Sequence, residues 1–316
     1  MRINKHYEQI FSYLPRSVSQ LLEQADRPLN GLEELRLRPL IPPLLRFADG
    51  EAFLCPGGKL SPDPKDGKAL TCEEMRKTVL LLTDSSFYAL EEELRRGYIT
   101  LPGGHRAGLC GHGILQDGRI RTLRDISSVN IRVAGVVTGA AAPLLPRLQD
   151  KDGRLQHTLI VSPPGAGKTT LLRDIARAVS DGDGIRAMRV GMVDERSELA
   201  ALRGGIPQLP VGIRTDVLDG CPKAEGINML LRSMAPELLV CDEIGMAEDA
   251  AAIRDAINGG VRLLVSAHGG SRQEILSRPV LAELMAEHAF HRIVLLSRRN
   301  GPGTVDWISA EGDEPC

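Results

Sequence analysis

Residues 159–173 of this 316-residue chain read LIVSPPGAGKTTLLR, which predicts a strand, a loop and a helix in succession. The apolar run ending at Val161 suits a buried strand, and Leu171, Leu172 and Ile175 recur at the spacing of one helix face. Between them lies a loop of the phosphate-binding pattern G-x-x-x-x-G-K-[ST], with Ser162 in place of the first glycine. A loop of this kind presents backbone N–H groups and a helix N-terminus to an anion, so a nucleotide site is expected here.

The residues expected to bind the nucleotide are Ser162, Pro163, Pro164, Gly165, Ala166, Gly167, Lys168, Thr169 and Thr170. Lys168 can reach the β- and γ-phosphates of ATP, and the Thr169 hydroxyl can ligate Mg²⁺. The competing interpretation is a strand–turn–helix unit that contains Gly-Lys-Thr by chance. The strand before the loop and the helix after it favour the nucleotide site.

Composition places the chain among ordinary globular proteins and predicts two domains from its length. A net charge of −2 and 3% aromatic residues argue against nucleic-acid binding by bulk charge or base stacking. The six cysteines form neither a C-x-x-C pair nor a zinc-binding spacing, which favours reduced thiols. With no signal peptide and no apolar run of about 20 residues, we expect a cytoplasmic protein, either free or peripheral to a membrane.

The order of the expected elements predicts an α/β protein of two parts. Residues 1–135 mix helical and alternating patterns, as in an α+β domain, and 136–156 have the composition of an interdomain linker. Residues 157–316 alternate strands with helices, as in a parallel sheet that binds ligands at its strand C-termini. The expected strands of this second domain lie near 157–161, 189–193, 237–241, 261–266, 291–297 and 304–309.

Two carboxylates follow the apolar strand expected at 237–241. Asp242 is positioned to support Mg²⁺, and Glu243 to orient and polarise the water that attacks the γ-phosphate. The alternative is an acidic strand end that caps the next helix. About seventy residues after a phosphate-binding loop, the pair instead favours hydrolysis of a phosphoanhydride.

Two further strand ends are expected at the same edge of the sheet. His268 ends the strand that begins near 262 and can sense the γ-phosphate, although a histidine that merely caps the following loop is the competing interpretation. Glu195 follows the strand near 190–193 and can reach the metal through a water molecule, and its neighbour Arg196 can pair locally. A solvated helix start would also explain both residues.

With these motifs in place, the chain resembles the traffic ATPases of type II and type IV secretion and of pilus assembly, and within them the stage III sporulation protein AA family. The segments that carry the resemblance are 97–111, 124–132, 162–175, 193–198 and 241–245. The resemblance implies an α+β N-terminal domain, a RecA-like P-loop ATPase domain and a hexameric ring. It also implies that N-domain arginines reach the nucleotide, and the candidates are Arg119, Arg121, Arg124 and Arg132.

The sporulation family further implies ATP and Mg²⁺ as cofactors and a role in energising a channel between mother cell and forespore. Its expected partner is a membrane-anchored channel protein like stage III sporulation protein AB, at the mother-cell membrane. Two alternatives remain open at this point. One is an ATPase stimulated by nucleic acid, and the other is a scaffold in which ATP holds the ring together without significant turnover.

Overall fold

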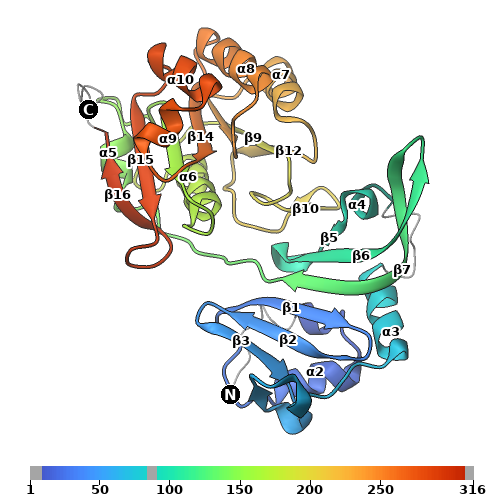
Figure 1. Ribbon diagram of the computed structural model, residues 1–316. Coiled ribbons are helices and arrows are strands. Elements are labelled where there is room, and N and C mark those ends of the chain that lie inside the picture. Colours follow the sequence, from blue (N-terminus) through green and yellow to red (C-terminus); the bar gives the residue numbers. More distant parts are fainter. Residues whose placement is uncertain (1–8, 84–90, 310–316) are drawn as a thin grey trace. The chain divides into compact units, whose positions relative to one another are not determined.

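The computed structural model describes residues 9–83 and 91–309, and the chain divides into two compact units, Met1–Ala134 and Gly135–Cys316 (Figure 1). Within the described ranges, no helix has both the length and the apolar character needed to cross a membrane. A helical pattern of apolar residues starts at Ile3, and its first six residues, 3–8, fall outside these ranges, as does the start of the helix expected from Ser86.

The first unit is built on a seven-stranded antiparallel sheet of order β4-β3-β2-β1-β7-β6-β5. Its strands are β1 (Leu32–Arg38), β2 (Ile41–Phe47), β3 (Gly50–Leu54), β4 (Leu60–Ser61), β5 (Tyr98–Thr100), β6 (Arg106–Gln116) and β7 (Arg119–Arg132). Its helices are α2 (Arg16–Glu23), α3 (Cys72–Leu82) and α4 (Glu91–Arg96). Helix α3 begins with the capping box expected from its sequence, in which Thr71 and Glu74 exchange side-chain and backbone hydrogen bonds.

Alternation along β1 and β7 gives this sheet one apolar and one charged face. Leu35, Leu37 and Ile131 are fully buried in a core that also contains residues of all three helices. The residues between them, such as Arg36, therefore lie on the opposite face. The alternating pattern within 118–133 is interrupted and by itself predicts two strands, but these residues form the single strand β7, which pairs with both β1 and β6.

The second unit holds a seven-stranded sheet of order β12-β9-β13-β14-β8-β15-β16, parallel except for β16. Its strands are β8 (Thr158–Ser162), β9 (Val190–Asp194), β12 (Thr215–Asp219), β13 (Leu238–Cys241), β14 (Arg262–His268), β15 (Arg292–Ser297) and β16 (Thr304–Ile308). A small hairpin pairs β10 (Leu202–Arg203) with β11 (Ile206–Pro207). The edge strand β12 was not expected, because its Asp and Thr residues hide the apolar pattern of a strand.

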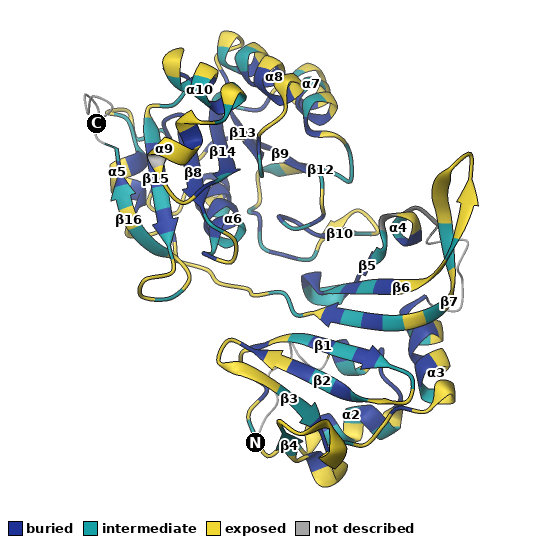
Figure 2. Cartoon of the chain, in the orientation of Figure 1, coloured by how far each residue is buried: buried dark blue, intermediate teal, exposed yellow. Residues whose placement is uncertain are grey.

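Helices cover both faces of this sheet. They are α5 (Leu145–Leu148), α6 (Lys168–Asp181), α7 (Lys223–Ser233), α8 (Ala247–Asn258), α9 (Arg272–Leu276) and α10 (Pro279–Ala286). Alternate residues of β8 enter different cores: Ile160 packs with α5 and α6, and Leu159 and Val161 pack with α7, α8 and α10. Strands β8, β9 and β13 are buried along their whole length, which explains their nearly continuous apolar sequences (Figure 2).

The segment expected to be an interdomain linker, 136–156, packs largely against the second unit. Ala141, Leu145, Leu148 and Leu155 are almost fully buried in the core around α6. The Ala141 N–H also donates to the buried carboxylate of Asp174 at 2.8 Å. The proline and glycine content that indicated a flexible connection instead belongs to a short helix and two turns, and its leucines are core residues.

Candidate active site

The loop between β8 and α6 adopts the backbone conformation that its glycines predict. Gly165 and Gly167 have φ values of 69° and 88°, and Gly167 is the residue that caps α6 at its N-terminus. These left-handed conformations favour glycine because it has no Cβ. Ser162 fits the position usually held by glycine because it is the last, fully buried residue of β8, and its carbonyl accepts from the Gly269 N–H at 3.0 Å.

Strand order then brings the expected acidic residues beside this loop. In the sheet, β14 lies between β13 and β8, and the carboxyl ends of these parallel strands share one edge. Lys168 Nζ donates to Glu243 Oε1 at 2.9 Å and lies 3.3 Å from Asp242 Oδ1. The Thr169 hydroxyl donates to Asp242 Oδ2 at 2.8 Å. The structure thus brings Lys168, Thr169, Asp242 and Glu243 together.

Ser266, on β14, holds both carboxylate residues in place. Its hydroxyl donates to Asp242 Oδ1 and accepts from the backbone N–H of Glu243 at 3.0 Å. Glu243 itself has a φ of 53°, an unfavourable conformation for a residue with a side chain, so the surrounding contacts must fix it. Sequence reasoning missed Ser266, because a small polar residue inside an apolar strand resembles an ordinary core position.

The electrostatics of the site keep Glu243 ionised. Burial favours its neutral form, but the hydrogen bond and charge of Lys168, with the charges of Arg196 and His268, hold the pKa of Glu243 below its ordinary value. Arg196 contributes directly, since its Nη1 donates to Glu243 Oε2 at 2.9 Å. The sequence indicated only a local partner for Arg196, whereas its partner Glu243 is 47 residues away.

His268 and Glu195 have different surroundings. His268 is the last residue of β14 and is paired with Ser162 of β8 in the sheet register, and its charge helps to lower the pKa of Glu243. Glu195, expected to reach the metal through water, accepts a hydrogen bond from Lys223 at the start of α7. Lys223 is buried, so this ion pair ties β9 to α7.

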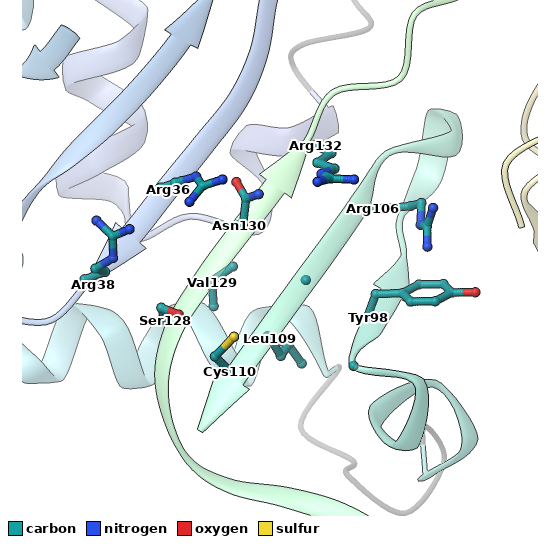
Figure 3. A pocket seen from close by; sticks show the side chains of 12 residues that line it. Arg36, Arg38, Tyr98, Arg106, Leu109, Cys110, Ser128, Val129, Asn130 and Arg132 are labelled. Carbon is teal, nitrogen blue, oxygen red and sulfur yellow. The ribbon is translucent and has the colours of Figure 1, made fainter. Parts of the chain in front are cut away.

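The four candidate arginines lie on β7 in the first unit. Arg119, Arg121 and Arg124 are exposed on its first half, where Arg124 is 3.5 Å from Asp125. Arg132 instead lines a hollow of about 300 Å³ on the charged sheet face, together with Arg36, Arg38 and Arg106 (Figure 3).

The hollow that contains Arg132 has Gly97 and Gly108 among its lining residues and no aspartate or glutamate. Figure 3 shows side chains from β1, β5, β6 and β7 around it. The Arg106 guanidinium lies 3.9 Å from the centre of the Tyr98 ring, and nearby Glu34 pairs with Arg36 at 2.9 Å. The signal that could have found Arg36 was the alternation Leu-Arg-Leu-Arg over 35–38, which puts both arginines on one face.

The fold of the chain is found in solved structures. It matches the ATPase DotB of Legionella pneumophila with a TM-score of 0.57 at 14% identity, over 89% of this chain and 76% of that one. It matches the pilus retraction motor PilT with bound ADP with a TM-score of 0.53 at 16% identity, over 88% and 76% of the two chains. The expected fold class is confirmed: a RecA-like P-loop ATPase fold preceded by a smaller α+β unit.

The family follows from the sequence comparison. The profile of the family described as sporulation stage III, protein AA matches residues 4–314. Stage III sporulation protein AA of Bacillus subtilis (strain 168) is 43% identical over 302 residues, which cover 95% of this chain and 94% of that protein. The chain belongs to this sporulation family, as its sequence motifs indicated.

Proposed function

We propose that the chain is a Mg²⁺-dependent ATPase that works as a ring and energises a sporulation channel complex. The observation that carries the proposal is the grouping of Lys168, Thr169, Asp242 and Glu243 around the phosphate-binding loop. A simple nucleotide-binding site needs the loop and the lysine, but hydrolysis also needs a base beside them. Glu243 is ionised and adjacent, so it fits that role.

The residues present fit a magnesium ion. The Thr169 hydroxyl and the Asp242 carboxylate already share a hydrogen bond, and oxygen donors of these two kinds are those that Mg²⁺ prefers. Thr169 and Asp242 would hold the ion, and it would neutralise charge on the β- and γ-phosphate oxygens. Glu195 is already paired with Lys223, which leaves the first two residues as the stronger candidates.

The chain's own residues would then divide the work as follows. Backbone N–H groups of the loop bind the phosphates, and Lys168 exchanges its bond to Glu243 for a phosphate oxygen. Glu243 Oε1, released from Lys168, orients the attacking water and accepts its proton. His268, at the end of the neighbouring strand, contacts the γ-phosphate and senses its presence.

Among the four N-domain arginines, Arg132 has the strongest support for a contact with the nucleotide. It shares its hollow with three other arginines, a setting that suits a polyphosphate, whereas Arg119, Arg121 and Arg124 lie on the first half of β7 and do not line that hollow. We propose that this arginine hollow serves the nucleotide of the same chain or of a neighbouring chain in a hexameric ring.

The ring would act on the cytoplasmic face of the mother-cell membrane, docked on a membrane-anchored channel protein like stage III sporulation protein AB. Membership of the sporulation family supports this assignment. The fold shared with the ATPase DotB and the pilus retraction motor PilT supports a motor role. Stimulation by nucleic acid and a scaffold without turnover remain the alternatives that an activity assay must separate.

Steady-state ATPase activity across a range of protein concentrations tests the proposal, with wild type compared to Glu243→Gln and Lys168→Ala. We expect turnover per subunit to rise with concentration, Glu243→Gln to bind ATP without hydrolysing it, and Lys168→Ala to lose binding. If wild type binds ATP but all three proteins show equally negligible turnover, the scaffold alternative replaces hydrolysis. A salt-dependent increase with added DNA would favour the nucleic-acid-stimulated ATPase.

A further inference from the structure

The turn between β15 and β16 lies directly against the phosphate-binding loop. Strand β15 is the parallel neighbour of β8 on the side away from β14, so its carboxyl end reaches the edge where the loop begins. The Gly303 N–H donates to the Ala166 carbonyl at 2.8 Å. A Cβ at Gly167 would lie only 3.1 Å from the Gly303 nitrogen, so this close approach also depends on glycine.

Arg298, the residue that follows β15, lies beside Gly165 of this loop. A Cβ at Gly165 would lie 3.5 Å from Arg298 Nη1 and 3.8 Å from its Cζ, which puts the guanidinium group in contact range of the loop backbone. Its neighbour Arg299 is directed elsewhere: its side chain is 81% exposed and lies 3.8 Å from Asp306. Within residues 9–83 and 91–309, the structure records no acidic partner for Arg298.

The direction of a bound nucleotide follows from the positions of Lys168 and Glu243. Both mark the terminal-phosphate end of the site, and Glu243 follows β13, on the β14 side of the loop. A nucleotide whose last phosphate lies there extends its ribose and base toward the opposite side, where β15 and β16 lie. In that orientation of the nucleotide, the Arg298 guanidinium would lie on the nucleoside side of the site.

The second unit offers few other flat groups for a base. Among residues 135–316 the aromatic residues are Phe290 and Trp307, and both pack against the hydrophobic core. A guanidinium group is planar and cationic, and it stacks on π systems more effectively than an ammonium group. Arg298 places such a group beside Gly165 of the loop.

We infer that Arg298 stacks on the base of the bound nucleotide, so that the turn 298–303 forms the base side of the site. This inference rests on the proposed nucleotide-binding function. It assigns Arg298 a contact with the nucleoside and none with the phosphates, which distinguishes it from Lys168. Because inorganic triphosphate has no base, its affinity should not depend on Arg298.

The experiment compares wild type, Arg298→Ala, Arg298→Lys and Arg299→Ala. Dissociation constants for ADP are measured with a fluorescent analogue, and those for inorganic triphosphate by competition. We expect Arg298→Ala to weaken ADP binding about tenfold, and Arg298→Lys to restore little of it because the ammonium group is not planar. Arg299→Ala should stay within about twofold of wild type. Triphosphate affinity should be the same in all four proteins, which also shows that each phosphate-binding loop is intact.

Three results would overturn the inference, and they are distinguishable. If Arg298→Ala weakens triphosphate as much as ADP, Arg298 is a phosphate contact and not a base contact. If Arg298→Ala binds ADP like wild type, the turn does not contribute to the site, although the proposed function stands. If wild type itself binds neither ADP nor triphosphate, the proposed function fails first and the inference fails with it.

Discussion

Replacement of Glu243 by glutamine should produce two opposite effects, tighter nucleotide binding and lost hydrolysis. In the structure Lys168 is bound to Glu243 at 2.9 Å, so a phosphate must compete with this carboxylate for the lysine. Glutamine keeps the shape and an acceptor oxygen but removes the negative charge. The lysine is then held less strongly by its own protein and is more available to the ligand.

The size of the binding effect follows from the exposure of the ion pair. The Lys168 side chain is 8% exposed but that of Glu243 is 36% exposed, so solvent weakens the pair. An ion pair with one buried and one partly exposed partner contributes about 1 kcal/mol once screening by solvent is included. Its loss should lower the dissociation constant for ADP about fivefold. Turnover of ATP should fall by at least about a hundredfold, because the general base is gone.

Affinity for ADP is the appropriate measure, since ADP cannot be consumed during the titration. The matched control is Glu237→Gln, the same substitution before the other end of β13, where the carboxylate accepts from the Arg189 N–H at 3.0 Å. This control substitution should change neither the affinity for ADP nor the turnover of ATP. If Glu243→Gln binds ADP no more tightly than the control, the competition for Lys168 is not real. Undiminished turnover would remove Glu243 as the base.

Three further predictions concern stability and the loop. Asp194→Asn should lower the free energy of unfolding in urea by about 2–3 kcal/mol, because this buried carboxylate accepts from four backbone N–H groups, those of 198–201. Burial, with nearby positive charge, lowers the pKa of His157 to about 4, so stability present above pH 6.5 should fall by as much as about 3 kcal/mol as the pH drops toward 4. His157→Gln should flatten that pH profile, and an unchanged profile would exclude His157 as its source. Gly167→Ala should destabilise the chain by about 1–2 kcal/mol and abolish ADP binding, since its φ is 88° and its Cβ would crowd Gly303; normal binding would refute the close approach.

The sequence was a good guide to the centre of the site for a physical reason. The C-terminal ends of parallel strands lie at one edge of a sheet. Polar residues that follow apolar strands in the sequence are therefore expected to lie close to one another at that edge. Asp242, Glu243 and His268 each follow or end an apolar strand, so the sequence alone predicts that they lie near the loop. This prediction needs only the strand assignments, and the nearly continuous apolar sequences of fully buried strands make these easy to recognise.

The other features of the site depend on which partner a side chain contacts and on the register of the strands. No local sequence pattern determines either of these. Arg196 could have paired with several nearby acids, and its bond to Glu243 depends on how the chain turns after β9. The arginine hollow requires β1, β6 and β7 to pair in one register, and that brings Arg36 and Arg132 together from positions almost a hundred residues apart. The linker was misjudged because its buried leucines are separated by prolines and glycines.

The two oxygens of Glu243 imply an order of events in the proposed mechanism. One accepts a hydrogen bond from Lys168 and the other from Arg196, so a phosphate that takes the lysine leaves the carboxylate with Arg196 as its hydrogen-bonded cation. Without Arg196, departure of Lys168 would remove the strongest force that keeps Glu243 ionised, and its pKa would rise as the site filled. In the proposed mechanism Arg196 would therefore be a positioning residue: it would hold Glu243 ionised and directed at the water while Lys168 binds the phosphate. The same bond draws the turn after β9 toward the site, so movement of that turn would release the base and stop hydrolysis.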